Sequence, residues 1–134
     1  MKSINVSILT VGLVLALLVA GCSREAEQAP LGPVGQTYVT RESLEPDKLA
    51  SIWLVKRYVD NQTRFVFVAD GVPLTNGIPF DTPEAAFRRY ANLSCFESIL
   101  KKHHITDPAI RHIGELIHDI EINYWGEKRF AESE

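Results

Sequence analysis

A strand, a helix and a second strand are predicted in succession between residues 36 and 69, and this order constrains the fold more than any other feature. "QTYVTR" (residues 36–41) is rich in β-branched and aromatic residues, as short strands are. "RFVFVA" (residues 64–69) is a continuous apolar run, which is typical of a strand covered on both faces. Consecutive strands joined through a helix favour a parallel βαβ unit in a small α/β domain.

The helix between these strands is predicted to begin after Pro46, with Asp47 as its N-terminal cap. Several apolar residues recur at helical spacing and are expected to face the core. These residues are Leu49, Ile52, Trp53 and Val59, and Leu54 and Val55 widen the same face.

The remaining elements are a third short strand and about three C-terminal helices. The strand is expected near residues 78–80, after an Asn-Gly turn. The first helix is expected to begin near Thr82, the second at Ser94, which forms a capping-box pattern with Glu97, and the third after Asp107. The third helix carries a stripe of isoleucine and leucine and is expected to end close to residue 121.

The first 21 residues have the features of a secretory signal. Lys2 is followed by an apolar run over residues 11–20, which is too short to cross a bilayer because a spanning helix needs about 20 apolar residues. The run ends in "LVAGC", which resembles the lipobox of bacterial lipoproteins, where the cysteine, here Cys22, is lipidated and becomes the first mature residue. An ordinary secretory signal with a chance cysteine is the alternative.

A lipid anchor at Cys22 predicts a protein held on a membrane of the cell envelope. Residues 22–36 are polar and then rich in proline and glycine, so they are expected to form a flexible tether for a domain over residues 37–134. Ser23 is not the aspartate associated with retention in the inner membrane. The outer membrane, facing the periplasm, is therefore the preferred location.

Charge and cysteine content exclude some classes of protein. Removing residues 1–21 removes one positive charge, Lys2, so the formal net charge changes from −3 to −4. A mildly acidic domain does not suit nucleic acid as a partner. Of the 2 cysteines, Cys95 has no intramolecular partner if Cys22 carries lipid, so no disulfide framework is expected.

Several segments together resemble the C-terminal domain of the ChrB-type chromate-resistance proteins. They are "TYVTRESLEPDKLASIWLVKRYVD", "FVFV", "IPFD", "SCFESIL" and "IHDIEI". The resemblance extends from about Thr37 to Tyr124 and is most specific in the first helix. Members of the family are regulators of, or accessories to, chromate resistance, and they often carry an extra N-terminal domain. The resemblance therefore implies a role in metal or oxyanion stress.

The chain departs from the family pattern at three positions. Arg89 stands where the family has a histidine, and Ser94 stands where it has a cysteine, with Cys95 one place later. Glu121 replaces an aspartate of the C-terminal motif and keeps the charge and the oxygen donors.

The segment "HDIE" near the end of the third helix is a candidate metal site. His118 and Glu121 are three residues apart, so on a helix their side chains are neighbours that can share a ligand, with Asp119 between them. Imidazole and carboxylate ligands suit Mn, Fe, Zn or Ni. At least one more ligand must come from elsewhere in the chain, for instance Asp47, Asp81 or Glu97. A solvated helix end is the alternative.

Two further residues are candidates for chemistry. Cys95 lies just inside a predicted helix N-terminus, where the helix dipole favours a reactive thiolate, although a small buried cysteine is equally consistent with the position. Arg41 follows the first strand and can bind an oxyanion beyond the carboxyl ends of the strands. Alternatively, Arg41 pairs with Glu42 or Asp47.

No nucleophile–base arrangement, H-E-x-x-H motif or glycine-rich phosphate loop occurs in the sequence. The leading hypothesis is therefore a membrane-anchored, non-catalytic domain that binds a metal or an oxyanion. A small metal-dependent enzyme and a structural lipoprotein without ligand are the alternatives, and the sequence does not indicate a protein partner.

Overall fold

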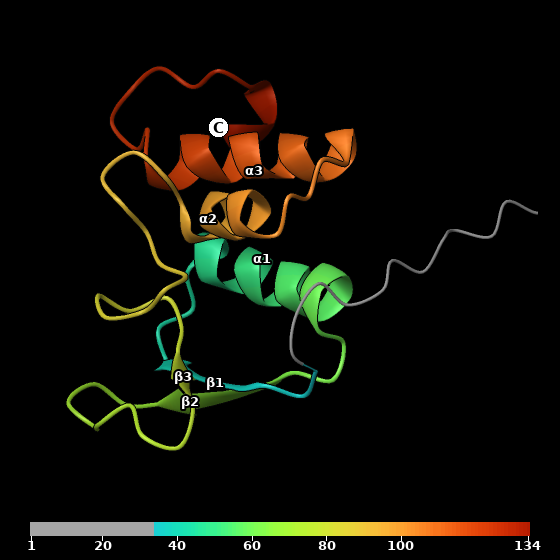
Figure 1. Ribbon diagram of the computed structural model, residues 1–134. Helices are drawn as coiled ribbons and strands as arrows, with labels where there is room; N and C mark the ends of the chain where they lie inside the picture. The colour runs from blue at the N-terminus through green and yellow to red at the C-terminus, as the bar shows by residue number, and fades with distance from the viewer. Residues whose placement is uncertain (1–33) are drawn as a thin grey trace, which may run out of the picture.

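Three parallel strands lie at one end of the molecule, and three helices are stacked on one side of the sheet (Figure 1). The computed structural model describes residues 34–134, so the predicted signal, the Cys22 lipidation site and most of the predicted tether lie outside it. In chain order the elements are β1 (Thr37–Arg41), α1 (Pro46–Leu54), η1 (Val55–Val59), β2 (Arg64–Val68), β3 (Ile78–Pro79), α2 (Cys95–Lys102), α3 (Pro108–Glu121) and η2 (Ala131–Ser133).

β1 is the central strand, and β2 and β3 pair with it on either side. Both pairings are parallel, with Val39 opposite Val66 in β2 and opposite Pro79 in β3. The predicted βαβ unit and the α/β fold class are therefore confirmed. On the helix side of the sheet, Tyr38, Phe65 and Phe80 pack together with ring centroids 5.0 to 5.4 Å apart.

Helix α1 lies between the sheet and α2 and is covered on two sides (Figure 1). It is followed by one turn of π-helix, η1, in which Asp60 N–H donates to the carbonyl oxygen of Val55 at 2.8 Å. The predicted apolar face of this helix is only partly correct. Leu54 and Val55 are buried, but Leu49 is 49% exposed and Trp53 is 43% exposed. The opposite row of the helix, which contains Asp47 and Ser51, faces inward instead. There Asp47 accepts hydrogen bonds from the Ser51 hydroxyl and from Cys95 N–H at the start of α2.

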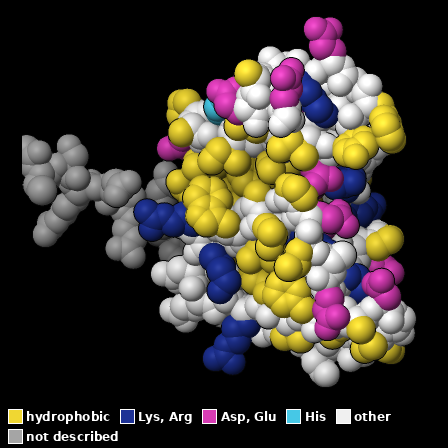
Figure 2. All heavy atoms as spheres, turned by 180° about the vertical axis from the view of Figure 1, so that it is seen from behind, with side chains coloured by type: hydrophobic (Ala, Val, Ile, Leu, Met, Phe, Trp, Pro, Cys, Tyr) yellow, Lys and Arg dark blue, Asp and Glu magenta, His cyan; other side chains and the backbone are white. Residues whose placement is uncertain are grey.

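Strand β2 is not covered on both faces, contrary to the expectation from its apolar sequence. The helices lie on one side of the sheet only (Figure 1). In β2, Val66 is 44% exposed and Phe67 is 40% exposed. Figure 2 shows that exposed apolar side chains also gather across the face of the molecule that is turned away from the view of Figure 1.

The helix predicted near Thr82 does not form. Residues 81–93 make turns and one isolated bridge between Tyr90 and Leu93. Asp81, the residue before the expected start, has a φ of 50°, in the left-handed region.

Helices α2 and α3 begin where their capping residues predict. The Ser94 hydroxyl accepts from Glu97 N–H at 3.1 Å, and Ser94 N–H donates to the Glu97 carboxylate at 2.8 Å, which completes a capping box. Asp107 accepts from the N–H groups of Ala109 and Ile110 at the start of α3. Gly114 of α3 lies where the two helices meet. A Cβ at this position would approach the Leu100 side chain of α2 to 3.0 Å. Within residues 34–134, no helix has the length and apolar character needed to cross a membrane.

Candidate functional site

A pocket with a volume of about 520 Å³ lies beyond the carboxyl ends of β1 and β3. This is the place where parallel sheets generally bind ligands. Four cationic and three acidic side chains line the pocket, which leaves one positive charge in excess. These residues are Arg41, Lys48, Arg88, Arg89, Glu45, Asp81 and Glu84.

At the inner wall of the pocket, Lys48 is almost completely buried. Only 2% of its side chain is exposed, and its ammonium group donates to the Ser43 carbonyl and to the Ser43 hydroxyl, both at 2.8 Å. The same ammonium lies 3.8 Å from a carboxylate oxygen of Asp81. Lys48 therefore places a positive charge inside the fold, next to a carboxylate.

Asp81 is the most perturbed acid in the pocket. Burial raises its pKa from the ordinary 3.8 to about 6, and the negative charge of Asp47 adds to the rise, while Lys48 opposes it. An acid of this kind in a pocket can change its protonation state near neutral pH, which makes it a candidate functional group.

Arg41 and Arg88 are held in the pocket by backbone carbonyl groups. Arg41 Nη1 donates to the carbonyl oxygens of Ala69 at 2.8 Å and Val72 at 2.6 Å. Arg88 Nη1 donates to Pro83 at 3.0 Å and Ala85 at 3.1 Å. Within residues 34–134, neither guanidinium forms an ion pair with a carboxylate. The predicted alternative, in which Arg41 pairs with Glu42 or Asp47, is therefore wrong.

Asp47 does not cap its own helix. The N-cap of α1 is Glu45, whose side chain makes no capping bond. Asp47 instead accepts from the N–H groups of Cys95 at 2.7 Å and Phe96 at 2.9 Å, so it caps α2, a helix 48 residues further along the chain. Burial raises the pKa of Asp47, although these backbone hydrogen bonds act to lower it.

Cys95 has no exposed surface. Burial raises the pKa of its thiol, and the charges of Asp81 and Asp47 raise it further. This position favours the inert, buried alternative over a reactive thiolate, because the two carboxylates oppose the effect of the helix dipole.

The predicted metal ligands His118 and Glu121 point toward different partners. His118 Nδ1 lies 2.8 Å from the Glu97 carboxylate of α2. The Glu121 carboxylate pairs with Arg89 and lies 3.5 Å from the backbone nitrogen of Asp47. Arg89 also lies 3.5 Å from Glu45, so it joins the pocket rim to the end of α3.

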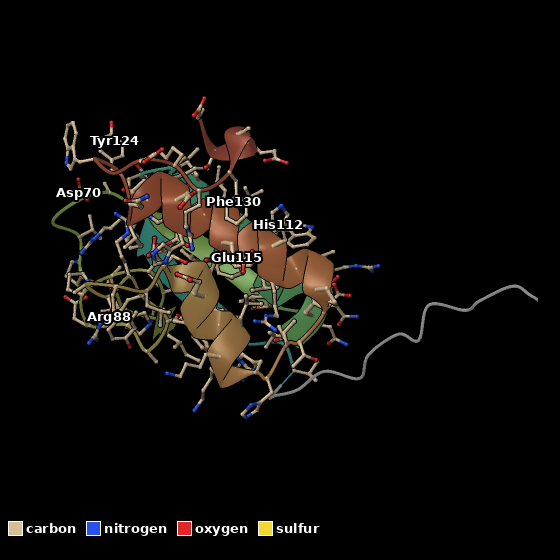
Figure 3. All side chains as sticks on the ribbon, turned by 90° about the horizontal axis from the view of Figure 1, so that it is seen from above. Asp70, Arg88, His112, Glu115, Tyr124 and Phe130 are labelled. Atoms are coloured by element: carbon tan, nitrogen blue, oxygen red, sulfur yellow. The ribbon has the colours of Figure 1, made fainter. Side chains whose placement is uncertain are left out.

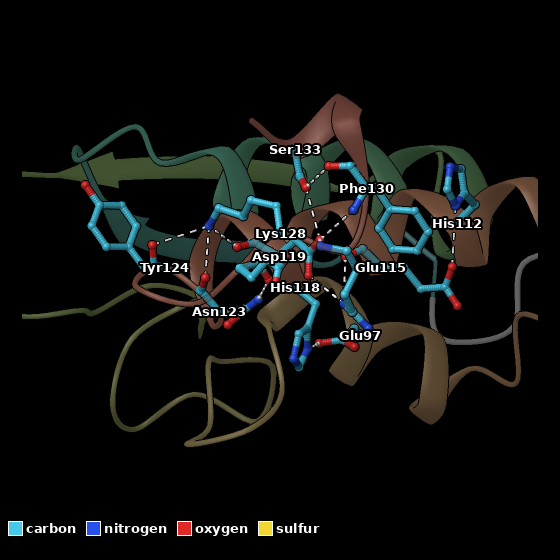
Figure 4. A network of polar contacts seen from close by, with 12 residues as sticks. Glu97, His112, Glu115, His118, Asp119, Asn123, Tyr124, Lys128, Phe130 and Ser133 are labelled. Atoms are coloured by element: carbon cyan, nitrogen blue, oxygen red, sulfur yellow. Dashed lines mark hydrogen bonds and ion pairs between the residues drawn. The ribbon is translucent and has the colours of Figure 1, made fainter.

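Asp119 lies on the other side of α3 and is covered by the C-terminal segment (Figure 4). Its carboxylate accepts from Arg129 Nε at 2.6 Å, from Arg129 N–H at 2.6 Å, from Phe130 N–H at 3.2 Å and from the Ser133 hydroxyl at 3.0 Å. Burial acts to raise the pKa of Asp119, but the hydrogen bonds from Arg129 and Ser133 and the charge of Arg129 hold it well below the ordinary 3.8.

The predicted metal ligands His118, Asp119, Glu121 and Asp47 therefore do not converge on one point. Each carboxylate among them already has a partner from the chain: Arg129 for Asp119, Arg89 for Glu121 and the α2 N-terminus for Asp47. In residues 34–134, no group of three or more His, Cys, Asp or Glu side chains is arranged to hold a metal ion. Metal binding by these residues stays a prediction, and a metal would first have to displace these partners.

Sequence reasoning missed Lys48, Arg88 and Arg129. From the sequence, a lysine and two arginines are expected to face solvent, and no local pattern identifies them as site residues. Arg129 and Ser133 belong to the segment after α3, whose return over Asp119 has no signature in the sequence.

Comparison with known proteins places the chain in a family. Residues 38–134 match the family model described as "ChrB, C-terminal domain". "Protein ChrB" from Cupriavidus metallidurans is 26% identical over 90 residues, which cover 66% of this chain and 28% of that protein. The chain thus matches less than a third of the length of that relative. No solved structure matches this chain. The chain belongs to the ChrB C-terminal domain family, and residues 38–134 form a ChrB-type chromate-resistance domain.

Proposed function

We propose that the pocket beyond β1 and β3 binds a tetrahedral oxyanion of the chromate type, and that the protein is an accessory in metal or oxyanion stress. The observation that carries the proposal is the state of Arg41 and Arg88. Both are held through Nη1 by backbone carbonyls, and neither has a carboxylate partner among the described residues. A guanidinium carries five N–H donors, so each arginine keeps donors for a ligand.

The charges inside the pocket support an anion rather than a cation. The carboxylate of Asp81 already faces the ammonium of Lys48 at 3.8 Å, and Arg89 lies against Glu45 and Glu121. The chain itself thus supplies the cations that these acids need. Arg41, Arg88 and Glu84 are then the pocket charges without an ion pair in the described chain, which leaves one positive charge in excess. A sulfate-like dianion suits the two guanidinium groups.

Direct titration tests the proposal. Chromate, and sulfate as a redox-inert dianion of the same shape, are titrated into the purified protein by calorimetry. We expect Arg41→Gln and Arg88→Gln each to weaken binding about tenfold or more, because a charge-assisted hydrogen bond contributes about 1.5–3 kcal/mol. Arg57→Gln is the matched control, since Arg57 is exposed and lies outside the pocket. Absence of binding, or an equal loss in the control, would refute the oxyanion site.

Binding should also depend on pH through Asp81. Below a pH of about 6 the carboxyl is protonated, which removes one negative charge from the pocket and adds an O–H donor. Sulfate is the suitable probe because it stays a dianion over this range. We expect its affinity to fall as the pH rises through this value, and Asp81→Asn should remove this dependence.

A cation at "HDIE" is the second candidate, because His118 and Glu121 lie three residues apart near the end of α3 and Glu97 of α2 lies 2.8 Å from His118. Metal analysis of protein purified without chelator tests it. If His118→Ala combined with Glu121→Gln abolishes the uptake of Mn, Fe, Zn or Ni and leaves the helical content unchanged, these side chains are ligands. A double variant that binds metal like the parent would exclude them.

We also propose that the protein is anchored to the cell envelope through lipid on Cys22. The support is the apolar run followed by "LVAGC". Mass spectrometry of the protein from its native host should find an acylated cysteine as the first residue. An unmodified N-terminus at residue 22 or later would contradict the anchor and, with it, the outer-membrane location.

A further inference from the structure

The two edges of the sheet differ in how they are protected. β3 has two residues and contains Pro79, which has no N–H to offer to another strand. β2 has five residues and contains neither proline nor a charge within its centre. Natural proteins usually blunt edge strands with such features, because an open edge pairs with other chains. The β2 edge lacks this protection within the described residues.

The backbone of β2 offers hydrogen-bonding groups on its outer side. Arg64 N–H donates to Gln36 at 2.9 Å, and the Val68 carbonyl accepts from Glu42 N–H at 3.2 Å, so these residues face β1. Because successive residues of a strand point to alternate sides, the N–H and C=O groups of Phe65 and Phe67 face away from β1. No hydrogen bond joins these groups to another residue of the described chain.

The side chains around this edge are apolar in the centre and oppositely charged at the ends. Val66 and Phe67 are more than a third exposed. Arg64 and Asp70 lie three positions before and after Phe67, and neither has an ion-pair partner within residues 34–134. Figure 3 shows Asp70 at the margin of the molecule.

We propose that this edge is an interface for a second copy of the chain, with two β2 strands paired antiparallel about a twofold axis at Phe67. In this register Phe67 faces Phe67 of the other copy, and Arg64 of each copy lies opposite the turn just beyond β2 that carries Asp70 of the other. Two opposite-charge pairs therefore form at once. The register centred on Val66 instead places Arg64 opposite Val68 and leaves both charges without partners, so charge complementarity selects Phe67 as the centre.

The pairing closes on itself and is limited in length. A twofold arrangement uses the β2 edge of each copy, so neither β2 edge stays open for a third copy. It therefore gives a dimer of two three-stranded sheets rather than a fibre. The ladder ends near Ala69, because the Ala69 carbonyl already accepts from Arg41 and from Val72 N–H. Pairing of short strands buries a small area, so a weak, concentration-dependent dimer is expected.

Charge exchange tests the dimer. Sedimentation of the purified protein over a range of concentrations should show a monomer–dimer equilibrium. Arg64→Asp gives a copy with two negative ends, and Asp70→Arg gives a copy with two positive ends. Each variant alone should dimerise about tenfold more weakly or worse, because both attractive pairs become repulsive. An equimolar mixture of the two should recover the affinity of the parent, because each end then meets its opposite.

Arg111→Glu is the matched control, since Arg111 is an exposed cation on α3 with no ion pair in the described chain, and it should leave the dimer unchanged. A parent that stays monomeric overturns the proposal, as does a mixture that associates no better than its components. Protection of the Phe67 amide from hydrogen exchange in a monomer would show that another segment of the chain covers the edge, and it would overturn the proposal too.

Discussion

Asp119 and Asp81 are both removed from solvent to a large extent, yet the fold shifts their pKa values in opposite directions. Asp119 has no exposed surface and accepts four hydrogen bonds, so the charged form is stabilised and its pKa is low. Asp81 is largely buried and lies near Asp47, and both effects disfavour its charged form. The ammonium group of Lys48 at 3.8 Å only partly offsets them, so the pKa of Asp81 is about 6.

The difference separates a structural acid from a candidate functional acid. A buried carboxylate whose oxygens are all used fixes the segments that supply the donors, here α3 and the chain after it. A carboxylate with incomplete partners in a pocket can still change its protonation state or respond to a ligand. By this criterion Asp119 is part of the scaffold, and Asp81, in the pocket proposed to bind an oxyanion, is a candidate functional acid.

The same substitution at the two positions gives the strongest test. Asp119→Asn should lower Tm more than substitution of Asp47, Asp81 or His118, because an amide can accept only part of the four hydrogen bonds and leaves Arg129 without its partner. Trypsin should then cleave after Lys128 and Arg129 in the otherwise folded protein.

In the parent, stability should be lost progressively as the pH falls below the ordinary value of 3.8, because the depressed pKa of Asp119 favours the folded, ionised form. An Asp119→Asn protein as stable as the parent would contradict the assignment of Asp119 as a structural acid.

Asp47 lies between these extremes and sharpens the comparison. It accepts three hydrogen bonds, from Cys95 N–H, Phe96 N–H and the Ser51 hydroxyl, yet burial raises its pKa. Asp47→Ala should lower the free energy of unfolding by about 2 kcal/mol, because two buried N–H groups at the start of α2 lose their acceptor. Chemical denaturation measures this change. A loss well below about 1 kcal/mol would mean that Ser94 alone suffices as the cap.

Asp81→Asn should have the opposite sign from Asp119→Asn. A raised pKa means that the ionised form costs stability, so the contribution of Asp81 is fully present below pH 3.8 and is lost as the pH rises to about 6. At neutral pH the amide should therefore leave stability unchanged or raise it by up to about 1 kcal/mol, because the partly exposed pocket screens the charge. Melting curves of parent and variant, recorded from acid to neutral pH, should converge at the acid end. Curves that stay parallel would show that Asp81 does not titrate there.

His118→Ala should have the smallest effect. The pair between His118 and Glu97 is partly exposed, and such pairs contribute about 1 kcal/mol or less. Denaturation of His118→Ala beside Glu97→Gln measures it. A loss comparable to that of Asp47→Ala would place this pair with the structural acids.

The sequence predicted only those parts of the candidate site whose positions follow from residues close by in the chain. Arg41 is the last residue of the predicted strand and of β1, and the structure places it in the lining of the pocket beyond the carboxyl end of that strand. The spacing of "HDIE" placed His118 and Glu121 on neighbouring parts of α3, but it could not show that Arg89 and Glu97 approach them from other elements. Cys95 could be placed at a helix start but not inside the core, because its burial depends on α1 packing over it.

The sequence by itself determined the parallel strand–helix–strand order and the starts of α2 and α3. Their signals, which are a β-branched segment, a capping box and an aspartate before a proline, act within a few residues and do not depend on the rest of the chain. Only the tertiary structure decided that Asp47 caps α2, that Lys48 faces Asp81 and that the C-terminal segment covers Asp119. These contacts join residues far apart in the chain, and a charged side chain that is buried with its partner has the same local sequence pattern as one that stays in water.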